Sequence, residues 1–203
     1  MRRTKEAAAT TREQLLQAAL EIFRTKGYTL TTLDDIARQA GTTRGAIQWH
    51  FGNKAELFNT LQRECYERIA HKFGEIYASN GTPLQILRRM LVRWLGYAEE
   101  DTNFRAILEL TFLKTEVGPE LQGGLQEKIQ GNQQAQQGFE GLIRQGIASG
   151  EIRSDVNPAV AARSAMGLIH GITNLWLLNP EAFSLKDSAE ETIDLFLQGI
   201  VCQ

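Results

Sequence analysis

The sequence predicts an all-α protein of about nine helices, divided into a small N-terminal three-helix head and a larger helical body. Three observations predict this fold class. Apolar residues recur at steps of three and four through most of the chain. Thr, Asn or Asp stands directly before most of these segments, and Gly or Pro follows them. With 203 residues, the chain is long enough to bury a substantial core.

Charge is distributed unevenly between the two parts. Residues 1–54 hold nine Lys/Arg and five Asp/Glu, a net charge of +4, whereas residues 55–203 hold thirteen and nineteen, a net charge of −6. A basic head on an acidic body favours a nucleic-acid-reading head. Because the excess of four positive charges is modest, it supports DNA binding only together with a DNA-binding motif.

The sequence contains none of the common motifs of enzymes or metal-binding proteins, so we expect neither function. The sequence lacks a Gly-rich phosphate loop, an HExxH pair, a nucleophile elbow and any clustered carboxylates. Its two cysteines, Cys65 and Cys202, have no metal-ligand spacing and are expected to be reduced. We expect no cofactor and no metal. Without a signal peptide or a membrane-length apolar run, we expect a cytoplasmic protein that does not bind membranes.

The first helix is predicted to begin at Thr10, whose hydroxyl forms a capping box with Glu13, and to end at Gly27. Residues 1–9 before it form a short basic arm. Such an arm either reaches DNA phosphate or a minor groove, or is simply a frayed terminus.

Two short helices then meet in a tight turn. Thr32 caps the first, with Asp35 completing its capping box, and Gly41 ends it. The second covers residues 44–50 and is capped by Thr42 or Thr43. Two helices joined in this way form a helix-turn-helix, although a surface hairpin with no ligand has the same local signals.

In a helix-turn-helix, the second helix enters the major groove of DNA. Arg44 can pair with a guanine edge or a phosphate, and Gln48 can pair bidentately with adenine. The candidates for DNA contact are Thr42, Thr43, Arg44, Gly45, Gln48, Trp49, His50 and Lys54. The last two lie at the end of the helix and just beyond it, where donors usually meet phosphate.

Residues 41–58, GTTRGAIQWHFGNKAELF, resemble the signature of the TetR family of one-component transcriptional repressors. Within this stretch, TRGAI-x-WHF-x-NK is most similar to the AcrR-like branch, which represses multidrug-efflux genes. The similarity begins in residues 11–28 and becomes weaker after Phe58. Gln48 stands where the family usually has Tyr, and Gly52 stands where it often has Lys. The resemblance therefore implies no particular operator sequence.

Six helices are predicted in the body. The first runs from Lys54 to about Ser79 and, because it is too long for the head, bridges to the body. The others begin at Thr82-Pro83, at Asp101-Thr102, near residue 119, at Asn157-Pro158 and near residue 187. Residues 119–149 hold eight Gln and six Gly, so we expect a kinked or mobile helix there. It is either a wall that yields to a ligand or a solvated surface helix.

The resemblance implies a C-terminal ligand-binding and dimerisation domain over residues 55–203, behind a DNA-binding domain over residues 1–54. The helix from Asn157 to Leu178 is apolar on nearly all sides, which suits burial against a second subunit. By resemblance, the last two helices pair with their twofold mates in a homodimer.

Polar and aromatic residues of the body are candidates for an effector site. The candidates are Tyr66, Trp94, Phe104, Ile107, Thr111, His170, Gly171 and Asn174, with Glu109 as a further polar position. An aromatic and apolar site with few polar groups binds bulky lipophilic compounds. The alternative for His170 is a satisfied histidine in the core.

Together these features predict a ligand-responsive repressor. As a dimer it binds a palindromic operator in double-stranded DNA, and a small lipophilic effector releases it, controlling an efflux or detoxification gene. The alternative is an architectural DNA-binding protein of the same fold that occupies many chromosomal sites and has no inducer.

Overall fold

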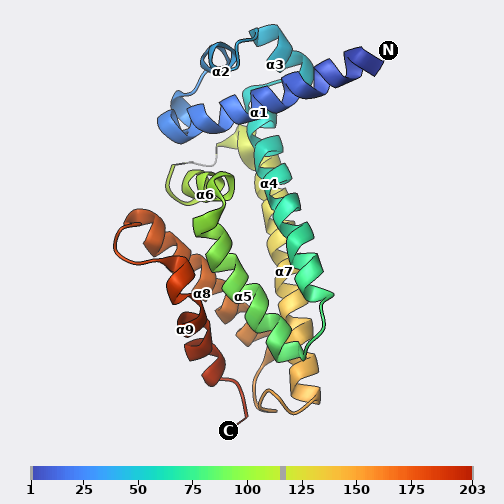
Figure 1. Cartoon of the computed structure of the whole chain (residues 1–203), viewed down its shortest axis with the longest axis vertical. Helices are drawn as coiled ribbons and strands as arrows, with labels where there is room; N and C mark the ends of the chain where they lie inside the picture. The colour runs from blue at the N-terminus through green and yellow to red at the C-terminus, as the bar shows by residue number, and fades with distance from the viewer. Residues whose placement is uncertain (1, 115–117, 203) are drawn as a thin grey trace. The chain divides into compact units, whose positions relative to one another are not determined.

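The computed structural model describes residues 2–114 and 118–202 and confirms the predicted all-α fold (Figure 1). The described residues form nine α-helices: α1 (Arg2–Leu30), α2 (Leu33–Gln39), α3 (Arg44–Phe51), α4 (Lys54–Tyr77), α5 (Pro83–Glu100), α6 (Thr102–Glu109), α7 (Gln122–Ala148), α8 (Pro158–Leu178) and α9 (Leu185–Gln198). A π-helical turn, Leu110–Lys114, follows α6, and a 3-10 turn, Pro119–Leu121, precedes α7. No described helix is long and apolar enough to cross a membrane.

The chain folds as two compact units. Unit 1 contains Met1–Glu67 and Ala106–Glu127, and unit 2 contains Arg68–Arg105 and Lys128–Gln203. Unit 1 therefore adds the first part of α4, the end of α6, the two turns that follow it and the start of α7 to the three N-terminal helices. The predicted boundary at residue 54 separates a DNA-binding domain from a ligand-binding domain by function, so it stays a prediction.

Unit 1 has an aromatic centre where α1 meets α4. The ring of Phe23 lies 5.2 Å from that of Phe58 and 5.8 Å from that of Tyr28, measured between ring centroids. Ile36 of α2 and Ile47 of α3 are fully buried in the same unit. These contacts hold α2 and α3 on a packed base, because both helices are too short to be stable alone.

Local capping chemistry sets the helix boundaries of the head, as the sequence predicts. The Thr32 hydroxyl accepts from the Asp35 amide, and the Asp35 carboxylate accepts from the Thr32 amide. Thr43 caps α3, and Asn53 caps α4 by accepting from the Glu56 amide. Gly41 adopts φ 62° after α2, a left-handed conformation that favours glycine.

The predicted start of α1 at Thr10 is wrong. The helix begins at Arg2, and the Thr10 hydroxyl donates to the carbonyl of Glu6 from within the helix. Ser and Thr make such bonds in helix interiors as well as at caps. A capping-box sequence alone therefore could not distinguish the two positions.

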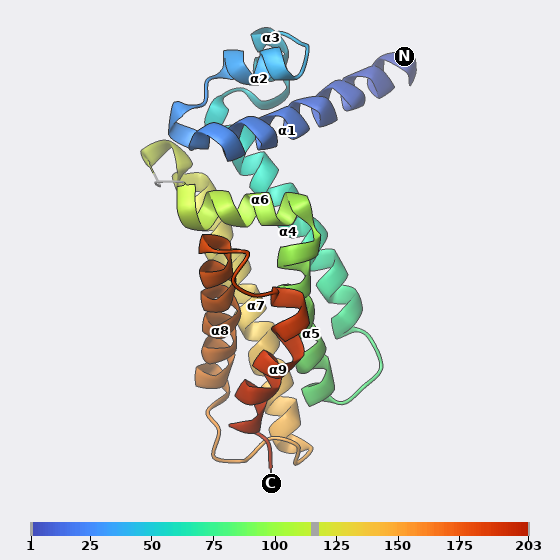
Figure 2. The same cartoon turned by 60° about the vertical axis from the view of Figure 1, so that its left-hand side comes forward.

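In unit 2, α9 lies along α5, and α8 packs against both helices (Figure 2). Arg88 of α5 joins the first pair through Asp194, with 2.6 Å between Nε and Oδ1. The capping box of Thr82 and Gln85 begins α5, and the Asn157 side chain caps α8, both as predicted. Leu87, Leu95, Ala165 and Ile193 are among the fully buried residues of this unit's core.

The Gly/Gln-rich stretch forms one uninterrupted helix, α7, so the predicted kink is absent from the structure. Most of its first half is exposed, and its buried residues gather near the end, at Phe139, Leu142 and Ile143. This exposure pattern fits a solvated helix along the first half. Its mobility remains a prediction.

Candidate nucleic-acid interface and effector site

Helix α3 presents one face to the core of unit 1 and another to solvent. Ile47 and Phe51 point inward and are buried. On the outer face, Arg44, Gly45 and Gln48 are exposed, and the Trp49 side chain is 74% exposed. A large aromatic residue that is exposed beside donors is a feature of binding surfaces, because it costs apolar hydration in the free protein.

The two threonines before α3 have different places. Thr43 is exposed, and its hydroxyl accepts from the Ala46 amide at 3.2 Å, which fixes the start of the helix. Thr42 is half-buried, and its amide donates to the carbonyl of Ala37. Capping occupies one lone pair of the Thr43 oxygen, so its hydroxyl hydrogen can still meet an acceptor.

Arg44 lies 3.7 Å from Asp34 of α2, measured from Nη1 to Oδ2. Both side chains are more than half exposed, and such ion pairs contribute little to stability. A DNA phosphate or a guanine edge can therefore compete for the guanidinium at low cost.

His50 ends the outer face and is half-buried beside the Trp49 ring, with 4.5 Å between the centroids. Burial and the charge of Arg12 lower the pKa of His50. The guanidinium of Arg12 lies 5.5 Å from the Phe51 ring centroid, and it also pairs with Glu64. Sequence analysis missed Arg12, because only the packing of α1 brings this cation beside α3.

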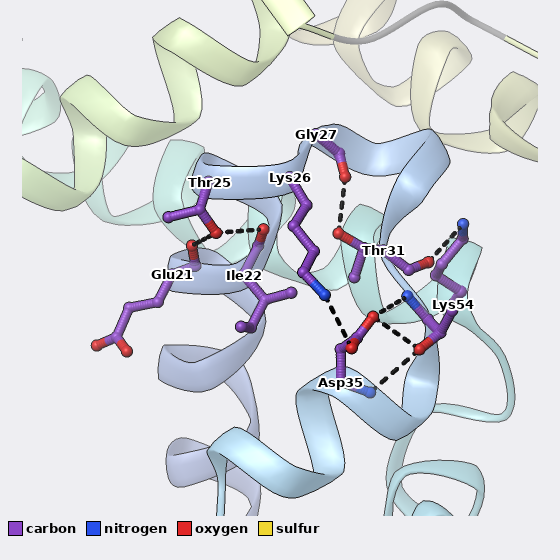
Figure 3. A network of polar contacts seen from close by, with 9 residues as sticks. Glu21, Ile22, Thr25, Lys26, Gly27, Thr31, Asp35 and Lys54 are labelled. Atoms are coloured by element: carbon purple, nitrogen blue, oxygen red, sulfur yellow. Dashed lines mark hydrogen bonds and ion pairs between the residues drawn. The ribbon is translucent and has the colours of Figure 1, made fainter.

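Lys54 has a structural role in unit 1. Its ammonium donates to the carbonyls of Tyr28, Thr29 and Thr31 at 3.0, 3.4 and 3.0 Å, and lies 4.4 Å from the centroid of the Tyr28 ring. Figure 3 shows its side chain directed at Thr31. An ammonium has three N–H bonds, and three carbonyls engage them. The predicted phosphate contact of Lys54 requires the exchange of at least one of these bonds.

A second polar group ties α1 to α2 (Figure 3). The ammonium of Lys26 lies 2.9 Å from the Asp35 carboxylate, which also caps α2 through Thr32. Hydrogen bonds from Lys26 and Thr32 hold the pKa of Asp35 well below its usual range. Nearby, the Thr31 hydroxyl donates to the carbonyl of Gly27 at 2.7 Å. The helix-turn-helix is therefore fixed to α1 at the end that Gly27 bends.

Three of the predicted effector residues belong to unit 1. Gln62 donates to the Thr111 hydroxyl at 3.0 Å, and Thr111 is also hydrogen-bonded to Tyr66. Burial raises the pKa of Tyr66 to about 12, so this phenol is neutral. Ile107 is buried on α6. The further candidate, Glu109, forms an ion pair with Arg24 at 3.1 Å.

The π-helical turn after α6 is bound to α1. The ammonium of Lys114 donates to the carbonyl of Arg24 at 2.8 Å, adding to the Arg24–Glu109 pair. Thr111, in the same turn, is held by Gln62 of α4. Single π-helical turns often occur at functional sites. This one connects α1 with α4, and the contacts with α1 join residues more than eighty positions apart in the sequence.

Unit 2 brings together three other effector candidates. The ring of Trp94 lies 5.2 Å from Phe104 and 5.4 Å from His170, measured between centroids. Phe104 is fully buried, whereas Asn174 is half-buried. Gly171 lies on the exposed side of α8, where an added Cβ would meet open space. The assignment of these residues to a ligand remains a prediction.

Among the described residues, no group of three or more His, Cys, Asp or Glu could hold a metal ion. Cys65 is buried, as its apolar helical position predicts, and Cys202 is exposed.

Comparison with known proteins identifies relatives along the whole chain. The model for bacterial regulatory proteins of the tetR family matches residues 15–61. A second model, for the C-terminal region of MAATS-type transcriptional repressors, matches residues 82–201. The first match contains α3, and the second contains α5, α8 and α9.

Individual relatives match this chain over nearly its full length. The HTH-type transcriptional regulator AcrR of Shigella flexneri is 31% identical over 202 residues, covering 97% of this chain and 92% of the relative. NalD, the secondary repressor of the MexAB-OprM multidrug efflux pump in Pseudomonas aeruginosa, is 30% identical with a TM-score of 0.85, covering 97% and 98%. The SmeT–triclosan complex is 27% identical with a TM-score of 0.79, covering 96% and 93%. AcrR is named as a transcriptional regulator, and NalD and SmeT are named as repressors of multidrug efflux pumps, so none of the three is an enzyme.

Proposed function

The chain belongs to the TetR family of bacterial transcriptional regulators, and we propose that it is a repressor of an efflux or detoxification gene that a small lipophilic effector releases. The observation that carries this proposal is the exposed outer face of α3, held by caps and a packed base. A rigid helix with exposed Arg44 and Gln48 has the donors that base edges require. We infer control of an efflux gene from the relatives, because two of them, NalD and SmeT, are named as repressors of multidrug efflux pumps.

In this proposal, two copies of the chain bind one palindromic operator. Each helix-turn-helix binds one half-site of an operator, and twofold symmetry gives the dimer two recognition helices. Residues 43–50 enter the major groove, while His50, Thr42, Lys54 and backbone amides meet phosphate. Binding is then steeply salt-dependent, because phosphate contacts release counterions. The protein acts in the cytoplasm, where the DNA is.

Effector binding in the body favours a form of the dimer that fits the operator less well. An effector shifts that equilibrium only by its difference in affinity for the two forms. The triclosan complex of SmeT supports a small lipophilic effector here. The contacts that Glu109, Thr111 and Lys114 make with α1 and α4 support a path from α6 to the head.

The test is fluorescence anisotropy on the DNA upstream of the protein's own gene, with and without a panel of lipophilic compounds. We expect tight, salt-sensitive binding that one compound class reverses. Arg44→Ala should weaken binding by about 5- to 150-fold, because a bidentate base contact contributes about 1–3 kcal/mol. Arg144→Ala, which removes a 64% exposed charge from α7, is the matched control.

Two outcomes would count against the proposal. Unchanged operator affinity of the Arg44→Ala protein would show that α3 is not the reading helix. Binding at many unrelated sequences, reversed by no compound, would favour an architectural DNA-binding protein of this fold.

A further inference from the structure

Tyr97 of α5 contacts cations from two helices of unit 2. The ammonium of Lys72 on α4 lies 4.3 Å from the centroid of the Tyr97 ring, and the guanidinium carbon of Arg93 on α5 lies 4.1 Å from it. Both groups also form hydrogen bonds with the phenol oxygen. An ammonium and a guanidinium only donate, so the oxygen accepts from both. We refer to Tyr97, Lys72 and Arg93 as the Tyr97 site.

Positive charge exceeds negative charge in the contacts around this phenol. Arg93 pairs with Glu100 at 3.0 Å, and Glu100 in turn pairs with Lys186 at 2.7 Å. Among the described residues, Lys72 has no carboxylate partner. Three cations therefore share one carboxylate, and the phenol oxygen is the further acceptor that two of them reach. Nearby cations favour the ionised form of a phenol.

Tyr97 differs from the other three tyrosines of the chain in the charges around its phenol. Burial raises the pKa of Tyr97, but the hydrogen bonds and charges of its two cations outweigh burial, so the pKa is lowered overall. In contrast, burial is the main cause that raises the pKa of Tyr28 and of Tyr66 to about 12. Tyr77 of α4 is 44% exposed, and no described cation lies over its ring.

The Tyr97 site faces solvent through its cations. Tyr97 itself is 9% exposed, whereas the Arg93 side chain is 43% exposed and Lys72 is half-buried. Side chains at the surface change rotamer rapidly, so the cover that these two cations form over the ring is not permanent. Because the donors that reach the phenol oxygen lie at the surface, a small molecule approaches this oxygen from the same side.

We propose that Tyr97 is a site of covalent modification, where the phenol oxygen attacks an electrophilic sulfur or phosphorus atom that bears oxygen atoms. A bond forms between the tyrosine oxygen and that atom, the bond to the leaving group breaks with its electron pair, and the phenol proton passes to water. Lys72 and Arg93 donate to the oxygens of the transferred group, where negative charge develops during the attack. This inference is independent of the proposed function, because the reaction is measured without DNA.

Labelling of the full chain with 4-(fluorosulfonyl)benzoate tests the site, because its leaving group is fluoride and its carboxylate suits a cationic surface. Peptide mass spectrometry over a time course gives the rate at each tyrosine. We expect Tyr97 to react at least about tenfold faster than Tyr77, although Tyr77 is far more exposed. Equal or faster labelling of Tyr77, labelling of Lys72 in place of Tyr97, or no labelling of the folded chain would overturn the inference.

Substitution of the two cations assigns the reactivity to them. Lys72→Met and Arg93→Met each remove one donor and should slow the labelling of Tyr97 severalfold, with the rate at Tyr77 unchanged. Lys72→Arg keeps a donor and should restore the rate. Arg144→Met, which removes a 64% exposed cation from α7, is the matched control.

A purely structural role of the cations makes a different prediction. If Lys72 only holds α4 against the Tyr97 ring, Lys72→Met lowers the thermal stability and leaves the labelling rate of Tyr97 unchanged. That result, found also for Arg93→Met, would refute a nucleophilic Tyr97 site. Tyr97→Phe should remove most of the label from the chain, as measured by intact mass, and a label that persists in full would place the reactive group elsewhere.

Discussion

Lys54 illustrates how one side chain can hold two parts of the head together. It lies at the first residue of α4, and its ammonium engages three carbonyls at the end of α1. Those carbonyls belong to the last turn and exit of a helix, where the amide four residues on is missing, although the Tyr28 carbonyl also accepts from the Thr31 amide at 3.3 Å. The Tyr28 ring covers the same ammonium. A point charge with three donors therefore replaces the missing helical bonds.

Lys54→Met should destabilise the protein by about 2 kcal/mol, because carbonyls that pair with a charged group lose it. Urea unfolding followed by circular dichroism measures the change. The control is Lys186→Met, which removes a 60% exposed ion-pair partner of Glu100 and should cost little. Equal effects of the two variants would contradict a structural role for Lys54.

His170 should make stability fall at acidic pH. Its pKa is lowered in the folded protein, whereas in the unfolded chain it is about 6.5. Below that value the unfolded chain binds the proton more readily, so stability is present above about pH 6.5 and is lost as the pH falls towards the folded pKa.

Urea unfolding at about pH 7.5 and about pH 5.5 measures this loss, which should be smaller in His170→Asn. His50→Asn is the comparison, since the pKa of His50 is also lowered but this residue is less buried. An unchanged pH dependence in His170→Asn would show that the histidine is hydrated in the folded protein.

At the scale of helices, Gly27 decides how α1 ends. Its backbone adopts φ 75° and ψ 167°, a region that is open almost only to glycine. The bend directs the chain towards Thr31 and α2, and the Thr31 hydroxyl closes it by donating to the Gly27 carbonyl. The carbonyl of Lys114, from the π-helical turn, lies 3.7 Å from where a Cβ would be.

Gly27→Ala should therefore destabilise the protein by about 1–3 kcal/mol, mainly through backbone strain. Gly74→Ala is the matched substitution, because Gly74 lies within α4 and a Cβ there meets nothing within 4 Å. It should stabilise the protein by up to about 1 kcal/mol through helix propensity. Thermal unfolding of both variants measures the contrast, and effects of the same sign would contradict it.

At the scale of the whole molecule, unit 2 exposes large apolar side chains on its two last helices. Leu175 and Leu178 of α8 and Leu195 of α9 are each more than 60% exposed. Exposed apolar patches of this kind mark interfaces between proteins. They support the proposed homodimer, in which the last two helices of each copy pair with their mates.

Leu178→Glu combined with Leu195→Glu should convert the proposed dimer into a monomer and weaken operator binding by at least about tenfold, because buried charges oppose association. Sedimentation velocity and anisotropy measure the two effects. Leu125→Glu, on the exposed first half of α7, is the control for the added charge. A double variant that remains dimeric would place the interface elsewhere.

The sequence by itself determined the helix class and most helix boundaries. Thr32, Thr82 and Asn157 each cap the helix that follows them, because a cap depends on residues two or three positions away. For α3 the sequence left Thr42 and Thr43 open, and the structure assigns the cap to Thr43. The outer face of α3 was also predictable, since its apolar residues Ile47 and Phe51 fix which side is buried. The false cap at Thr10 shows the limit of such local signals.

Only the tertiary structure decided what the long side chains do. Lys54 is predicted to meet phosphate, and packing brings its ammonium to the carbonyls of Tyr28, Thr29 and Thr31 at the end of α1, so a phosphate must exchange with at least one of them. Arg24, Glu109 and Lys114 meet across more than eighty residues, and Lys128 acts on His170 from another helix. Local sequence fixes backbone hydrogen bonds within a turn, whereas burial and charge pairing depend on which helices become neighbours. The helix-turn-helix was therefore predictable from the sequence, whereas the partners of these long charged side chains follow from packing.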